Sequence, residues 1–495
     1  MNRTTLSLIA GTTALAAVTG FAVLSAPDAS GGGPAVEAAA QLPVERTSLL
    51  CPRPSSSDVA ETAYTSFTPV TKGASGKGGA QLVPAGEESA DGGGKGKKAK
   101  PVLEPKEPGK PATGSTDGGD APALIGTAEG KFAPGWTVQE TTEVAAGTGR
   151  GLLGVNCTAP DTQFWFPGVS TAAGRTDYVH LTNPDDAAAV VDIELYGKDG
   201  ELKSTVGEGI TVRPRSTEPV LLSTLTTEKQ ADLTIHVSVR SGRVGAAVQA
   251  LDGKQGGDWL AAAADPAATA VLPGIPEDAT SVQLIAFTPG DTDADLKLRL
   301  ASPSGTITPA GSETLHVKAG MTATADLGAI TRGEAGSLLL SPTDESIPVV
   351  AALRVVRGKG ADRETAFIPA TRPVGKRATV ADNRAKGTTL ALTAPGRTAK
   401  VKVTASAGGS AGEPTTKTFT IKAGTTQNVE FPVPAGLKGP YALTVEPLTD
   451  TPVYASRTLE SKVDAIPAFT VQTLPDDRGT VAVPQAHEDV AVLQD

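Results

Sequence analysis

The chain has 495 residues, of which 39% are hydrophobic, 20% charged and only 4% aromatic, and its formal net charge is −10. An acidic chain with no cationic stripe is a poor partner for nucleic-acid phosphates, so we expect no nucleic-acid function. The 56 glycines and 38 prolines favour short strands and turns over helices, and the length predicts three or four domains.

The first residues are typical of an exported protein. No charge separates Arg3 from Asp28, and residues 6–24 are rich in Ala, Leu, Val and Thr. We expect residues 1–40 to be a signal peptide or an N-terminal membrane anchor. Both alternatives stay open, because the run is barely long enough to span a bilayer and the best small-residue cleavage site lies well beyond it. The expected location is extracellular, or the outer face of the cytoplasmic membrane in association with the cell envelope.

Two cysteines, Cys51 and Cys157, lie in the part of the chain expected to be exported. In an oxidising compartment, an even pair predicts a disulfide. An offset of 106 residues aligns the segment before Phe164 with the end of a later repeat. We therefore predict a degenerate β domain over residues 41–160, with Cys51 on its opening strand and Cys157 in its exit segment.

Within that domain the composition changes over residues 71–123. This stretch has no aromatic residue and is dense in glycine and proline, so we predict a disordered insertion. It contains the most basic run of the chain, KGKKAK at residues 95–100. Such a run could contact anionic wall polymers or lipid headgroups, or it could be a solvated loop.

A thirteen-residue pattern occurs three times at intervals of about 105 residues: ITVRPRSTEPVLL from Ile210, LHVKAGMTATADL from Leu315 and FTIKAGTTQNVEF from Phe419. Each copy alternates apolar and polar positions on both sides of a turn, which predicts a β-hairpin or a corner between two strands. Gly320 and Gly424 can supply the positive φ that such turns often need, and the first copy uses a proline there.

The segments around this pattern also recur in order, beginning with FWFPG, VLPG and FIPA. Short alternating strands with regular turns predict an all-β fold of tandem immunoglobulin-like β-sandwich domains. We place the repeats at 161–262 (repeat 1), 263–362 (repeat 2) and 363–495 (repeat 3, with a C-terminal β tail). Six residues on the last strands should then be buried in matching pairs: Val244 and Ala246, Val349 and Ala351, Val453 and Ala455.

A search for chemistry finds little. The four histidines, His180, His236, His316 and His487, lie in separate segments without metal-ligand spacing. The acidic run at residues 291–295 lacks the turning glycine and the final glutamate of a calcium loop. No nucleophile motif or phosphate-binding glycine loop is recognisable, so we expect no enzymatic activity, no metal and no cofactor.

Aromatic side chains are the remaining candidates for ligand binding. Phe164 and Phe166 should share one strand face while Trp165 points to the other. One face must be core, so the other offers a possible ligand platform or docks on a neighbour. For Trp136 and Trp259 we expect burial in a core or at a domain junction.

Several segments resemble a known family: LPVERTSLLCP from Leu42, AYTSFTP from Ala63, FWFPG from Phe164 and LTNPDDAAAVVDIELYGKDG from Leu181. They are similar to an actinobacterial secreted family, domain-of-unknown-function family 5719. The resemblance implies an exported envelope protein and no catalytic residue, because the family has no assigned activity.

Two functions follow as hypotheses. The first is a non-catalytic structural or scaffolding protein, a rod of sandwich domains laid end to end. The second is a glycan-binding module of the cell envelope. The expected partner is an envelope protein or a wall polymer, with possible membrane attachment through residues 6–24.

Overall fold

The computed structural model describes residues 39–86, 100–204, 206–408, 413–431, 433–434, 436–437 and 439–483. Their regular structure is β-strand, apart from three short 3-10 turns: η1 (Gly130–Phe132), η2 (Leu222–Thr224) and η3 (Gly360–Asp362). The strands form antiparallel sheets, so the predicted all-β class is confirmed. Residues Pro43–Thr480 form one compact unit. A second unit contains most of a two-stranded sheet, β1 (Ala40–Pro43) with β35 (Thr480–Val483).

The compact unit contains eight sheets, two for each of four repeats. In the N-terminal repeat, the outer sheet has the order β2 (Arg46–Cys51), β6 (Leu124–Glu129), β4 (Ala80–Pro84), and the inner sheet β5 (Ala112–Asp117), β3 (Ala60–Phe67), β7 (Thr137–Val144), β8 (Gly151–Asn156). In repeat 1, the outer sheet is β12 (Gly200–Leu202), β11 (Ala189–Gly197), β15 (Leu233–Ser241), β9 (Gln163–Val169), with β13 (Ile210–Val212) on β11. Its inner sheet is β14 (Thr217–Leu221), β10 (Arg175–Thr182), β16 (Gly245–Asp252), β17 (Gly256–Leu260).

Repeats 2 and 3 follow the same order. Repeat 2 has the outer sheet β18 (Ala270–Ile275), β24 (Gly336–Pro342), β20 (Ala294–Ser302), β21 (Gly305–Ile307), with β22 (Thr314–Val317) on β20. Its inner sheet is β23 (Thr322–Gly328), β19 (Ser281–Phe287), β25 (Val350–Arg357), β26 (Glu364–Pro369). Repeat 3 has the outer sheet β27 (Ala378–Asn383), β32 (Tyr441–Pro447), β29 (Ala399–Ala407), β30 (Thr415–Ile421), and the inner sheet β31 (Thr425–Val429), β28 (Thr388–Ala394), β33 (Tyr454–Val463), β34 (Ile466–Thr473).

Each repeat buries apolar side chains between its two sheets, as a β-sandwich does. The expected equivalence is confirmed by burial, since all six side chains are at most 5% exposed: Val244, Ala246, Val349, Ala351, Val453 and Ala455. They lie at the start of β16, β25 and β33, which are the next-to-last strands of their repeats, with each valine directly before its strand. The three valines also make equivalent isolated bridges, to Asp161, Ala267 and Val374. The periodicity of the sequence therefore identified the core-facing side of these strands correctly.

The thirteen-residue pattern is a corner that carries the chain from one sheet of a sandwich to the other. In repeat 2, β22 pairs with β20 in the outer sheet, and β23 pairs with β19 in the inner sheet. The turn glycines Gly320 and Gly424 have φ of 65° and 68°, as expected. In the first copy, Arg215 takes φ of 53° directly after the proline.

Two expected segment assignments differ from the structure. FIPA belongs to β26, the last strand of repeat 2, and repeat 3 opens at β27. The error arose because opening and closing strands share an apolar stretch that ends in proline. The stretch 71–123 also contains β4 and β5, which hydrogen-bond to β6 and β3 and supply strands of the N-terminal sandwich. Residues 87–99, with most of the KGKKAK run, lie outside the described residues.

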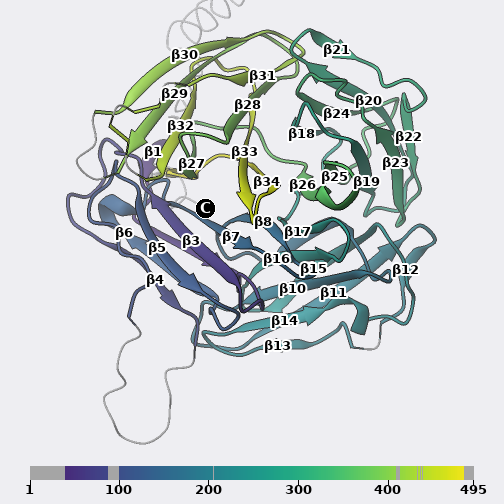
Figure 1. The fold of residues 1–495 in the computed structure, drawn as a ribbon, viewed down its shortest axis with the longest axis horizontal. Coiled ribbons are helices and arrows are strands. Elements are labelled where there is room, and N and C mark those ends of the chain that lie inside the picture. The colour runs from purple at the N-terminus through teal and green to yellow at the C-terminus, as the bar shows by residue number, and fades with distance from the viewer. Residues whose placement is uncertain are drawn as a thin grey trace, which may run out of the picture. The chain divides into compact units, whose positions relative to one another are not determined.

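The last strands of the four repeats pack against one another in a cycle. Strand β8 contacts β17, β17 contacts β26, β26 contacts β34, and β34 contacts β8, and their labels lie together in the middle of Figure 1. The opening strands make a second cycle: β2 contacts β16, β9 contacts β25, β18 contacts β33, and β27 contacts β7. The first and last repeats are thus neighbours, whereas the expected end-to-end rod would hold them apart.

Close packing at this axis depends on a glycine. A Cβ built on Gly154 of β8 would lie 2.4 Å from Nε2 of Gln472 and 2.6 Å from Cγ2 of Thr470, both on β34. Asp258 of β17 accepts a hydrogen bond from the Gly154 amide at 3.0 Å. Three repeats therefore meet at this one position.

We predict that Gly154→Val lowers the free energy of unfolding by about 1 to 3 kcal/mol or more, because the added methyl groups overpack the axis. Urea unfolding of the purified chain measures the change. Gly396→Val is the matched control, since no atom lies within 4 Å of a Cβ at that position. Equal effects of the two substitutions would contradict tight packing of the axis.

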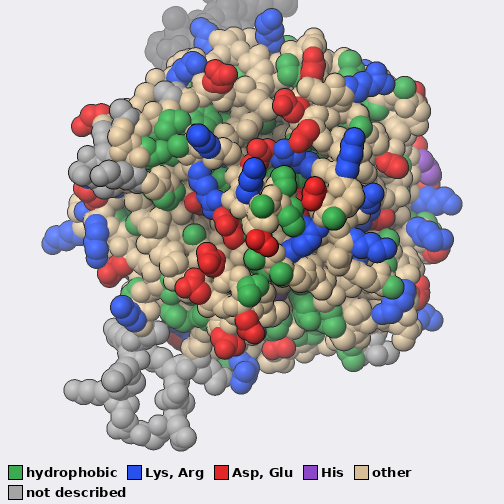
Figure 2. All heavy atoms as spheres, in the orientation of Figure 1, with side chains coloured by type: hydrophobic (Ala, Val, Ile, Leu, Met, Phe, Trp, Pro, Cys, Tyr) green, Lys and Arg blue, Asp and Glu red, His purple; other side chains and the backbone are tan. Residues whose placement is uncertain are grey.

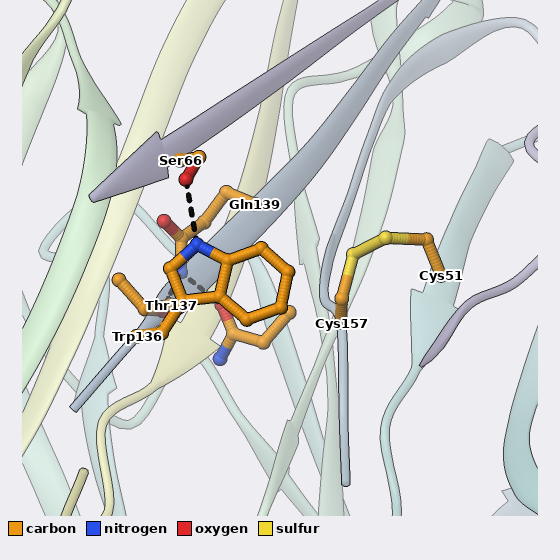
Figure 3. Close-up of a disulfide and its surroundings, with 7 residues drawn as sticks. Cys51, Ser66, Trp136, Thr137, Gln139 and Cys157 are labelled. Atoms are coloured by element: carbon orange, nitrogen blue, oxygen red, sulfur yellow. Dashed lines mark hydrogen bonds between the residues drawn. A yellow bond between two sulfur atoms is a disulfide. The ribbon is translucent and has the colours of Figure 1, made fainter. Parts of the chain in front are cut away.

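The predicted disulfide is confirmed. Cys51 at the end of β2 is bonded to Cys157, directly after β8, across 106 residues. Figure 3 shows Trp136 beside it, with the indole Nε1 donating to Oγ of Ser66 at 2.8 Å. Both sulfurs and the indole belong to the core cluster of the N-terminal repeat. The bridge thus joins the opening strand to the exit of the same sandwich.

We expect the double substitution Cys51→Ser with Cys157→Ser to cost about 4 to 5 kcal/mol, because the open loop gains chain entropy in the unfolded state. Denaturant unfolding under oxidising conditions measures this loss, and reduction of the native chain should reproduce it. Unchanged stability in both experiments would show that the bridge adds nothing to the fold.

Candidate functional site

A cleft of about 770 Å³ opens where repeats 2 and 3 meet beside the axis. Strand β25, the following loop and β26 contribute one wall; the β27–β28 loop, the end of β33 and the start of β34 contribute the other. We call it the axial cleft. Its charged lining residues are Asp278, Arg357, Lys359, Asp362, Glu364, Arg384, Lys386, Glu460 and Lys462. On the face of the molecule that Figure 2 shows, basic and acidic side chains are interleaved in the middle.

Arg357 joins the two walls of the axial cleft. Its Nε lies 2.7 Å from Oδ1 of Asp278 in repeat 2, and its Nη1 lies 2.7 Å from Oε1 of Glu460 in repeat 3. The guanidinium carbon lies 4.7 Å from the ring centroid of Phe469. A planar cation held by two carboxylates over an aromatic ring is fixed in position, so Arg357 braces the cleft.

A second ion pair involves Glu364, another lining residue of the cleft. Arg150, from the β7–β8 loop, pairs with Glu364 at the start of β26. The same guanidinium donates to the backbone oxygens of Ala361 and Arg363 at 3.0 and 3.1 Å. Burial raises the pKa of Glu364 to about 7, and the charge of Arg150 opposes that shift. This pair connects the N-terminal repeat to repeat 2 across the axis.

Three lysines of the lining lack such partners. Lys359, Lys386 and Lys462 are exposed, and no ion pair involves them within the part of the chain that the structure describes. Arg384, by contrast, lies 2.9 Å from Oε1 of Glu143. Among the lining groups, the lysines are therefore the cations left to meet a ligand.

The repetition of the fold explains why basic residues cluster at one end of the axis, near the axial cleft. Four equivalent hairpins lead into the axial strands, and each carries a basic residue in its loop or next to it: Arg150 in β7–β8, Lys254 in β16–β17, Lys359 in β25–β26 and Lys462 in β33–β34. Because the axial strands contact one another, these loops lie around one end of the axis. Aligning the repeats would have revealed the shared charge, but single-sequence motif searches did not.

The aromatic residues proposed as a ligand platform are buried. Phe164 and Phe166 belong to the core of repeat 1. Trp165 points to the other face, is 9% exposed, and lies 5.4 Å from the Phe287 ring of repeat 2. It therefore docks on the neighbouring repeat, which was the structural alternative. Trp136 and Trp259 are each 3% exposed, as expected.

The histidines and the acidic run lie apart from the axial cleft. His180 is buried, and burial lowers its pKa to about 3, so it stays neutral. His236 stacks on Trp165 at 3.9 Å between ring centroids. His316 lies 3.2 Å from Asp293 and 2.9 Å from Asp295, within the acidic run. No cluster with the makings of a metal site occurs among the described residues, and His487 lies outside them.

The interior of the compact unit also holds carboxyls with shifted pKa values. Burial raises the pKa of Glu140 and Asp258 well above the usual range, and raises that of Asp177 to about 6. Asp258 accepts from Oγ1 of Thr470 at 3.0 Å, across the axis. Neither oxygen of Glu140 has a hydrogen-bond partner among the described residues, which favours its neutral form.

These features define the protein class as an all-β protein of repeated sandwich-like sheets. Residues 112–432 match a family of unknown function, DUF5719, and the chain belongs to that family. The match covers the wall of the axial cleft contributed by repeat 2 and ends before Glu460. No curated protein matches the chain. In the described residues, no helix has the length and apolar character needed to cross a membrane, and residues 6–24 lie outside them.

The raised pKa of Glu364 predicts a pH-dependent stability. Between pH 4.5 and about 7 the folded chain binds more protons at this carboxyl than the unfolded chain. Stability at this site therefore falls as pH rises through that window and levels off above it. The free energy of unfolding of the native chain should fall between pH 5 and 8. In the Glu364→Gln variant, this fall should be smaller by about 2 to 3 kcal/mol.

Urea unfolding at several pH values measures this slope. Glu345→Gln, at an exposed position, is the control and should leave the slope unchanged. Asp177, Glu140 and Asp258 shift in the same direction, so a residual slope should persist in the Glu364→Gln variant. Identical slopes for the native chain and this variant would contradict the assignment.

Proposed function

We propose that the protein is a non-catalytic, exported cell-envelope protein that acts as a rigid scaffold. The observation that carries this proposal is the double cycle of contacts that joins four sandwiches in one compact unit. A cyclic set of interfaces resists bending more than single linkers do, because moving one repeat disturbs both of its neighbours. The disulfide is weakly compatible with an oxidising location outside the cytoplasm.

Binding of an envelope glycan is the second candidate. The axial cleft favours an anionic polymer as the ligand, because the cleft is concave and has unpaired lysines. The tryptophan that would have to stack on a neutral sugar, Trp165, is buried. Substituting Trp165 would remove packing between repeats 1 and 2, so it is a poor test of binding.

Export and scaffolding are tested together in cells. We expect the chain in the envelope fraction, open to protease added outside, with both cysteines blocked to alkylation until reduction. A partner protein should co-purify from a mild membrane extract with the native chain, and less of it with Gly154→Val, because the scaffold is loosened. Retention of a reduced chain in the cytosol would contradict export, and a partner held equally by both chains would contradict the role of the cycle.

A further inference from the structure

The axial cleft has an excess of cations that the fold does not use. The carboxylates of Asp278, Glu460, Glu143 and Glu364 all pair with arginines. The charged lining residues comprise five cations and four carboxylates, a net charge of +1, and those outside the pairs are three lysines and Asp362. This local excess stands out because the chain as a whole has a net charge of −10. An anion is therefore attracted to this cleft rather than to the surface in general.

The kind of cation indicates the kind of anion. The planar fork of arginine matches both carboxylates and phosphates, but both lining arginines, Arg357 and Arg384, already hold carboxylates, which leaves the lysines for a ligand. An ammonium group is a point charge with three donors on a flexible stem, which suits the several oxygens of a phosphate. We propose that the axial cleft binds a phosphate-bearing ligand whose phosphate oxygens contact Lys359, Lys386 and Lys462.

The size of the cleft bears on the rest of the ligand. A volume of about 770 Å³ lies in the range of sites for whole organic ligands and exceeds the needs of one inorganic phosphate. Pro467 of the lining is exposed and offers an apolar contact beside the lysines. The chemistry fits a phosphodiester carried on a larger molecule, such as an envelope polymer.

Two features prepare the site before any ligand arrives. Arg357 bridges Asp278 and Glu460, so the walls from repeats 2 and 3 stay at a set distance. Arg150 anchors the β25–β26 loop through the backbone oxygens of Ala361 and Arg363. The loop that carries Lys359 is therefore held in place, which lowers the entropy lost on binding.

Isothermal titration calorimetry of the purified full chain tests the proposal. The probe is an oligomer of glycerol phosphate; inorganic phosphate and polygalacturonate are the comparison ligands. The triple variant Lys359→Gln, Lys386→Gln, Lys462→Gln should bind the oligomer at least about tenfold more weakly. Lys229→Gln, Lys318→Gln, Lys422→Gln removes the same charge at exposed positions outside the cleft, and it should bind like the native chain.

The outcomes separate cleanly. Tighter binding of the oligomer than of polygalacturonate, lost only in the cleft variant, supports the proposal. Inorganic phosphate that binds as tightly supports phosphate recognition and identifies free phosphate as the source. No binding of either phosphate probe, equal loss in both triple variants, or equal binding of polygalacturonate overturns it. Thermal unfolding verifies that the variants fold, and the result is independent of export and scaffolding.

Discussion

The contact of four edge strands around one axis is the constraint on which the rest of the structure depends. An edge strand normally exposes unpaired backbone groups and invites aggregation. Here each inner sheet turns its last strand, β8, β17, β26 or β34, toward the corresponding strands of its neighbours. The absence of a side chain at Gly154 makes the close approach of β8 to Thr470 of β34 possible. Four vulnerable edges are thereby shielded together.

This arrangement also explains where charge lies. Hydrogen bonds and ion pairs connect repeats that are distant in sequence, such as Oγ1 of Thr141 to Oδ2 of Asp382 at 2.7 Å and Arg384 to Glu143. Buried charges are costly unless paired, so they favour one arrangement of the repeats over others in which they would lose their partners. The axial cleft lies at the edge of this network, where solvent reaches the lysines and the pairing stops.

Much of the sandwich could be predicted from the sequence, and the assembly could not. Alternation placed Val244, Val349 and Val453 on buried faces, and the turn glycines marked the corners, because both signals are local. The disulfide followed from the even number of cysteines in a chain expected to be exported, and internal alignment placed both cysteines in the N-terminal repeat. The predicted start of repeat 3 at FIPA is wrong because β26, the closing strand of repeat 2, carries the same apolar pattern as the opening strands. Residues 71–123 were misjudged because β4 and β5 take their stability from β6 and β3, which lie outside that window. The axial cleft was missed because its residues come from strand ends and loops of two repeats and share no motif.

The seam between repeat 3 and the N-terminal repeat joins the two ends of the compact unit. In the order of synthesis, the strands of the N-terminal sandwich and both of its cysteines precede β27 and β34, their neighbours across the seam. Until these two strands have been made, the surface of β7 and β8 that they cover is open to water. The growing chain therefore passes through a period in which three repeats are complete and one face of the N-terminal repeat is uncovered. The time needed to synthesise residues 378–473 sets how long that face is exposed to aggregation with other chains.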